Sequence, residues 1–213
     1  MDYNREDILN LDDREEIECG ARFPKKKAVL DWLFLRSPIS HVDLPEGYVE
    51  IGAGAFSESN ISTFKAEYGL EVIGKAAFSE CARLSSVIIP KSVKKIGWRA
   101  FKGCTSLKEL SIEGPLDEWE EQIAKGCVCL AKLTCNEKQK DMASEWVKNC
   151  PELKKINFVD DEGKVVESWG VSHIRNVLGS YNSVLKTKES YLEDYSSDFD
   201  HEKEYHGKDD FTL

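Results

Sequence analysis

The chain has 213 residues, 41% hydrophobic and 32% charged, which is enough to bury one sizeable core, with or without tails. Its net charge of −10 disfavours direct binding of DNA or RNA, and no run approaches the roughly 20 apolar residues of a membrane span. The N-terminal sequence MDYNREDILNLDDREE is acidic, whereas a secretory signal begins with positive charge. The odd number of cysteines, seven, favours reduced thiols. We therefore expect a cytoplasmic protein without membrane contact.

The negative charge is concentrated at the two ends of the chain. Residues 1–18 contain eight acidic and two basic residues, and residues 189–213 contain nine acidic and two basic residues. These segments carry −6 and −7, so the part between them carries +3. A slightly basic body is predicted between two acidic ends.

The first predicted element is a helix that follows Pro24. Three lysines and the sequence AVLDWLFLR come directly after this proline, which is favourable at the first position of a helix. The apolar residues surround most of this helix, as expected for burial against a first repeat. Residues 1–38 are thus interpreted as an acidic segment followed by a helical cap.

Apolar residues then recur at a regular step of about 23 residues, which indicates an internal repeat. Six strand-like runs result, each with apolar residues at its first, fourth and sixth positions: 39–44, 61–66, 84–89, 107–112, 130–135 and 153–158. One column consists of cysteines: Cys81, Cys104, Cys127 and Cys150. Further columns are Ile51, Ile73, Ile96, Trp119 and Met142, and Phe56, Phe78 and Phe101, weakening to Ala124 and Val147.

The repeat length predicts the fold. One unit of this length cannot bury its own apolar face, whereas strands stacked about 4.8 Å apart turn each column into a continuous core. One clear strand run per unit matches the leucine-rich repeat class, with units of about 20–29 residues. We therefore predict an α/β repeat solenoid over residues 39–160, with short parallel strands. The alternative is a right-handed β-helix, which needs about three strand runs per turn.

The units read IGAGAFSES and VIGKAAFSECARLSSVIIPKSVKKIGWRAFKGCTSLKELSI. They resemble the BspA-like class of leucine-rich repeats over about residues 39–158, and most specifically over 39–112. Beyond Gly114 the pattern weakens: the Ala-Phe pair becomes Ile123-Ala124 and then Trp146-Val147. The resemblance implies a curved solenoid with a parallel sheet on one side and a role in protein–protein recognition. It also implies, from its many secreted members, an adhesin as one alternative function.

After the repeats, a capping helix and an acidic tail are predicted. Ser172 is suited to cap the N-terminus of a helix with one apolar stripe, formed by Ile174, Val177, Leu178, Tyr181 and Leu185. Residues 161–188 would form this C-terminal cap, and residues 189–213 a disordered, solvated tail. The alternative for the tail is a docking segment for a basic partner, in which aromatic and acidic residues make the contacts: Tyr191, Asp194, Tyr195, Asp198, Phe199 and Asp200.

The sequence contains no motif for catalysis, a cofactor or a metal. No nucleophile elbow, zinc-protease motif, phosphate-binding loop or dinucleotide-binding loop is present. Cys127 and Cys135 belong to repeat columns and are expected in the core, while Cys129 lies off the columns and is expected to be exposed. His201 and His206 lie near Asp198 and Asp200, but nothing fixes a metal geometry there. We predict no enzyme activity, no cofactor and no metal.

The best candidate site is the outward face of the stacked strands. The side chains that alternate with the core residues should line up as two rows: His41, Thr63, Ser86, Glu109, Lys132 and Lys155, and Asp43, Lys65, Ile88, Ser111, Thr134 and Asn157. Such rows are the binding surface of many solenoids. The competing interpretation is an ordinary solvated sheet face.

Three functions remain open from the sequence. The first is an adaptor or regulatory subunit, monomeric on its own, that binds another protein through these rows. The second is an inhibitor whose acidic tail occupies a basic groove of a nucleic-acid enzyme. The third is the secreted adhesin implied by the resemblance.

Overall fold

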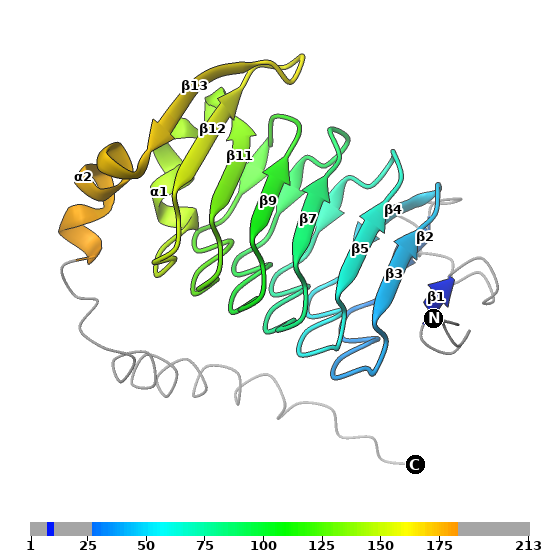
Figure 1. The fold of residues 1–213 in the computed structure, drawn as a ribbon. Helices are drawn as coiled ribbons and strands as arrows, with labels where there is room; N and C mark the ends of the chain where they lie inside the picture. Colours follow the sequence, from blue (N-terminus) through cyan, green and yellow to red (C-terminus); the bar gives the residue numbers. More distant parts are fainter. Residues whose placement is uncertain (1–7, 11–26, 183–213) are drawn as a thin grey trace, which may run out of the picture.

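The computed structural model describes residues 8–10 and 27–182, which wind into a solenoid of stacked coils (Figure 1). One side of the solenoid carries a row of longer strands, and the other side a row of shorter ones. The predicted solenoid, with one coil for each repeat of the sequence, is confirmed. Its core lies between the two rows.

The longer strands occupy all six predicted runs. They are β3 (His41–Leu44), β5 (Thr63–Ala66), β7 (Ser86–Ile89), β9 (Glu109–Ile112), β11 (Lys132–Asn136) and β12 (Lys155–Val159). Parallel pairing joins β3 to β5, and separately joins β7, β9, β11 and β12. The row is closed at its ends by β1 (Ile8–Asn10), parallel to β3, and by β13 (Val165–Gly170), antiparallel to β12.

A second parallel sheet gives each of the first coils another strand. Its strands, in spatial order, are β10 (Glu118–Trp119), β8 (Lys95–Ile96), β6 (Val72–Ile73), β4 (Tyr48–Ile51) and β2 (Lys27–Val29). The column Ile51, Ile73 and Ile96 lies on these strands and is fully buried. The expectation of one strand run per unit was therefore wrong. The second strand of each coil was not visible in the sequence, because the shortest of these strands are too short to show an alternating pattern.

Tight turns follow this second sheet, and successive coils approach closely there. Each turn has two positions with a left-handed backbone, as at Gly54 (φ +58°) and Glu58 (φ +56°). The glycine of the Ile-Gly pair lies against the neighbouring coil: a Cβ atom on Gly97 would be 2.5 Å from the backbone nitrogen of Lys75. The glycine of the Ile-Gly pair thus allows the close contact between successive coils.

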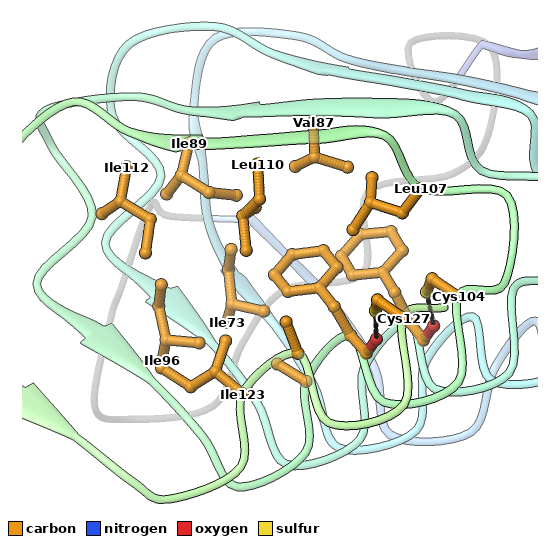
Figure 2. Packing of buried hydrophobic residues seen from close by; sticks show 14 of the residues in the cluster. Ile73, Val87, Ile89, Ile96, Cys104, Leu107, Leu110, Ile112, Ile123 and Cys127 are labelled. Atoms are coloured by element: carbon orange, nitrogen blue, oxygen red, sulfur yellow. Dashed lines mark hydrogen bonds between the residues drawn. The ribbon is translucent and has the colours of Figure 1, made fainter. Parts of the chain in front are cut away.

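The core is built from columns of identical side chains. Phe34, Phe56, Phe78 and Phe101 stack face to face, with neighbouring ring centroids 5.2 or 5.3 Å apart. Figure 2 shows Leu107, Leu110 and Ile112 packed above Ile96 and Ile123 in the same core. Stacked rings of this kind add attraction to the burial of apolar area.

The cysteine column is a second ordered element of the core. Each thiol donates a hydrogen bond to a carbonyl oxygen of the preceding coil, at Sγ–O distances of 3.0 to 3.2 Å: Cys81 to Phe56, Cys104 to Phe78, Cys127 to Phe101 and Cys150 to Ala124. Two of these bonds are drawn in Figure 2. Burial raises the pKa of Cys81 to about 11, so this thiol keeps its proton at neutral pH. These cysteines act as small core residues that also satisfy backbone carbonyl groups.

The predicted N-terminal helix is wrong. Residues 27–29 form β2, and Trp32 and Arg36 have left-handed backbones (φ +57° and +55°) that no α-helix permits. Val29 pairs with Ile51 and Phe34 stacks on Phe56, the residues at the same places in the next repeat, so the segment is one more coil of the solenoid. The described coils therefore start before the boundary expected at residue 39.

The repeat changes after β10. Ala143 takes the position of the Ile-Gly glycine, and the second sheet is replaced by a 3₁₀-helix, η3 (Glu137–Met142), and a short helix, α1 (Ala143–Trp146). The Trp146 side chain is buried there.

The segment predicted as a C-terminal cap, residues 161–188, contains β13 and the helix α2 (Val171–Asn182). Ser172 lies in this helix rather than before it, so its predicted capping role is wrong, while Ile174 joins the core. Leu178 and Tyr181 belong to α2, but their side chains, like Leu185, lie outside what the structure describes. None of the described helices is long and apolar enough to span a membrane.

Candidate interaction surface

Parallel pairing brings the predicted rows together on the face of the longer strands. Glu109, Lys132 and Lys155 are direct neighbours on β9, β11 and β12, and so are Ser111, Thr134 and Asn157. His41 is likewise opposite Thr63, and Asp43 opposite Lys65. We call the twelve predicted residues the strand-face ribbon. The burial pattern of these strands alternates as required, with the core residues buried between ribbon positions.

Most of the strand-face ribbon is accessible to a partner. Seven residues are exposed: Asp43, Thr63, Lys65, Ser86, Ile88, Glu109 and Lys155. His41, Ser111, Lys132 and Thr134 are partly buried. Ile88 is an apolar side chain with 58% of its surface exposed, in the middle of the row. It is the clearest candidate for an apolar contact on this face.

Asn157 does not fit the prediction of an exposed face. It is only 8% exposed, and its Oδ1 accepts a hydrogen bond of 2.8 Å from the hydroxyl of Ser168 on β13. The chain returns next to β12 as an antiparallel strand, which covers the position. A strand of opposite direction leaves no trace in the repeat, so this burial could not be predicted from the columns.

Charges of both signs lie on the ribbon. Lys65 forms an ion pair of 2.6 Å with Glu67, and this hydrogen bond, together with the charges of Glu67 and Asp43, raises the pKa of Lys65. Lys132 approaches Glu109 to 3.4 Å. Both pairs are exposed to solvent, where such pairs contribute about 0–1 kcal/mol. These side chains can therefore exchange their present partners for a bound protein.

Two further lysines lie at the end of the ribbon that carries Lys132 and Lys155, and they were not predicted as site residues from the sequence. Lys108 and Lys154 come directly before β9 and β12, and both are exposed. The backbone hydrogen bonds between coils already include them, since Ala131 N donates to Lys108 O and Lys154 N to Ala131 O. Lys108 and Lys154 occupy the same position two repeats apart, and this spacing could have identified them in the sequence. Ala131 occupies that position in the repeat between them and interrupts the pattern.

The remaining sequence candidates divide into three groups. Cys127 and Cys135 are buried core residues as predicted, and burial raises the pKa of Cys135 to about 12. Cys129 is exposed, also as predicted. The tail candidates lie outside the described residues: Tyr191, Asp194, Tyr195, Asp198, Phe199, Asp200, His201 and His206.

Short parallel strands stacked from one repeat to the next, with an exposed strand face, define a leucine-rich repeat solenoid, a class of protein-interaction modules that are generally not enzymes. The chain belongs to the BspA type leucine-rich repeat family, whose model matches residues 49–168 in six copies. The resemblance inferred from the Ile-Gly and Ala-Phe motifs is confirmed.

Similar solved structures are leucine-rich repeat proteins from bacteria. One from T. pallidum has 24% identity and a TM-score of 0.48, over 54% of this chain and 54% of its own. A leucine-rich cell surface protein from Faecalibacterium prausnitzii has 19% identity and a TM-score of 0.42, over 64% of this chain and 34% of its own. One from Bacteroides ovatus has 18% identity and a TM-score of 0.41, over 65% and 48%. The chain thus spans about a third to a half of these proteins. No curated protein matches it.

Proposed function

We propose that this chain is a non-enzymatic adaptor or regulatory subunit that binds another protein through the strand-face ribbon. It acts as a monomer in the cytoplasm, and its partner is a protein rather than a nucleic acid or a membrane. The support is the exposed strand face of a fold whose class consists of interaction modules.

The observation that carries the proposal is the setting of Ile88. This side chain is 58% exposed, at the centre of a face that is otherwise polar. Ser86 on the same strand and Ser111 opposite it are small and leave its sides accessible. An apolar anchor surrounded by small polar groups is the arrangement in which a partner gains most from excluding water.

The charges of the ribbon would set the orientation of the partner. Asp43 lies near the first end of the ribbon, while Lys132 and Lys155 lie near the other. Complementary charges on a partner increase the rate of association and disfavour the reversed orientation. Their contribution to the affinity is smaller than these two effects. We therefore expect a partner with an apolar side chain for Ile88 and acidic groups towards Lys155.

The test is site-specific photo-crosslinking in the native cell extract. A photoreactive amino acid replaces Ile88 in one variant and Tyr68 in a matched control. Tyr68 is 75% exposed, but it lies in the turn after β5 and not on the ribbon. The proposal predicts one crosslinked protein that is obtained from position 88 and not from position 68. Crosslinking of the same protein from position 68 alone would contradict the ribbon as the binding surface.

A further inference from the structure

We propose that the acidic C-terminal segment, residues 189–213, docks in the same molecule on the basic end of the strand-face ribbon when no partner is bound. The basic end consists of Lys108, Lys132, Lys154 and Lys155. The inference rests on the proposed function, because the segment would compete with the partner for this end of the ribbon.

The structure brings these lysines together from three neighbouring coils. Lys132 and Lys155 are opposite each other on β11 and β12, so their backbones are one strand spacing apart, about 4.8 Å. Lys108 and Lys154 precede their strands at the same edge. Four lysines thus lie at one end of the strand row, and two of them form ion pairs, with Glu109 and Glu152.

Those two acidic partners leave the lysines available. The Lys132–Glu109 and Lys154–Glu152 distances are 3.4 and 3.8 Å, and the lysine side chains are 41% and 68% exposed. Exposed pairs of this length contribute little. Lys155 has no ion pair within the described part of the chain. A ligand with several carboxylates would therefore gain contacts without breaking strong ones.

The C-terminal segment has the charge and the attachment point that this site requires. It contains nine acidic, two basic and five aromatic residues. The described chain ends with α2, which packs on β12 and β13 at the same end of the solenoid as the lysines (Figure 1). Residues 183–213 can extend to about 100 Å, while the six ribbon strands span about 25 Å.

The N-terminal acidic segment provides an internal comparison. It carries −6, close to the −7 of the C-terminal segment, but β1 pairs with β3 at the opposite end of the strand row. A purely general effect of negative charge would be the same for both segments. Docking through a short connection favours the C-terminal one, because its carboxylates are held at a high effective concentration beside the lysines.

The test is a comparison of lysine acetylation rates in the purified full-length chain, measured peptide by peptide by mass spectrometry. The tail variant carries Asp194→Asn, Asp198→Asn and Asp200→Asn, and the matched control carries Asp2→Asn, Asp12→Asn and Asp13→Asn. We expect Lys132, Lys154 and Lys155 to react roughly two- to fivefold faster in the tail variant, the range for loss of exposed ion pairs. Lys65 should react at an unchanged rate, and the control should match the natural chain.

Salt and dilution complete the test. At 1 M salt, where the screening length is about 3 Å, the difference between the tail variant and the natural chain should disappear. Equal rates in the two chains at low salt would overturn the proposal. Protection that decreases on dilution would also overturn it, because the occupant would then be the segment of a second molecule. The acetylation experiment contains no partner protein. A negative result would therefore overturn the docking of the tail, while the crosslinking at position 88 tests the binding of a partner separately.

Discussion

Lys132 and Lys155 lie opposite each other on neighbouring strands, but of these two only Lys132 forms an ion pair with a described residue, Glu109. On its other side, Lys155 is opposite Gly170, which has no side chain. The two lysines therefore make different contributions to the sheet itself, although both add positive charge to the same face.

The first prediction separates these two roles. Lys132→Glu loses the attraction to Glu109 but gains one to Lys155, so it should leave the free energy of unfolding nearly unchanged. Lys155→Glu replaces a repulsion from Lys132 by an attraction, and it should raise the free energy of unfolding by roughly 0.5 kcal/mol. Urea denaturation of the two variants measures the difference. Equal effects of the two substitutions would contradict the pairing of Lys132 with Glu109.

The second prediction concerns the phenylalanine stack. Phe78 is fully buried, with Phe56 and Phe101 stacked on its two faces at 5.3 and 5.2 Å. Phe78→Ala should lower the free energy of unfolding by about 3–5 kcal/mol, since it removes apolar contacts and leaves a cavity. The matched control is Tyr68→Ala, an exposed aromatic residue whose loss should cost less than about 0.5 kcal/mol. A loss below about 1 kcal/mol at Phe78 would contradict the stack.

The third prediction concerns the close approach of successive coils. Gly97→Ala would place a methyl group 2.5 Å from the backbone nitrogen of Lys75 and should destabilise the chain by about 1–3 kcal/mol. Gly170→Ala is the control, because nothing lies within 4 Å of its added Cβ. Thermal or urea unfolding measures both. Equal effects of the two substitutions would contradict the close approach of the coils at Gly97.

The fourth prediction is a pH dependence of the turn between β12 and β13. Asp161 accepts hydrogen bonds from Lys138 Nζ (2.7 Å to Oδ2) and Asn136 Nδ2 (3.0 Å), and these bonds hold its pKa below the usual 3.8. A lowered pKa means that the carboxylate stabilises the folded chain above pH 3.8 and that this contribution is lost as the pH falls through the folded-state value.

The Asp161→Asn variant should therefore be less stable than the natural chain at pH 7 and equal to it in strong acid. Urea midpoints between pH 2 and pH 7 measure the difference, and Glu162→Gln on the same turn is the control. A difference between Asp161→Asn and the natural chain that is independent of pH would contradict the role of the charge.

The repeat period predicted much of the fold, because one residue type must fill the same place in every coil. Cys104 and Phe101 each belong to a column that is visible in the sequence, and both are in the core. The N-terminal coil was predicted as a helix because Pro24 and the lysines after it favour a helix start. Val29 and Phe34 already kept the step of the repeat, and tertiary stacking overrode the local preference.

The candidate surface was predictable where strand alternation alone decides it. Ser86, Ile88 and Glu109 are exposed because they alternate with Val87, Ile89 and Leu110, whose side chains fill the core. Burial of Asn157 was not predictable, because it depends on the antiparallel return of β13 outside the repeat. The basic end was only half visible, since Lys108 and Lys154 precede their strands and belong to neither alternating row.

The most direct test of the central claim is the affinity of the partner obtained by crosslinking, measured for Ile88→Glu and for Tyr68→Glu. Ile88→Glu should weaken binding at least tenfold without changing the urea midpoint, since a buried apolar contact costs about 1.4 kcal/mol or more to lose at the centre of an interface. Tyr68→Glu should bind as the natural chain does. Unchanged affinity for Ile88→Glu would contradict the strand-face ribbon as the site of recognition.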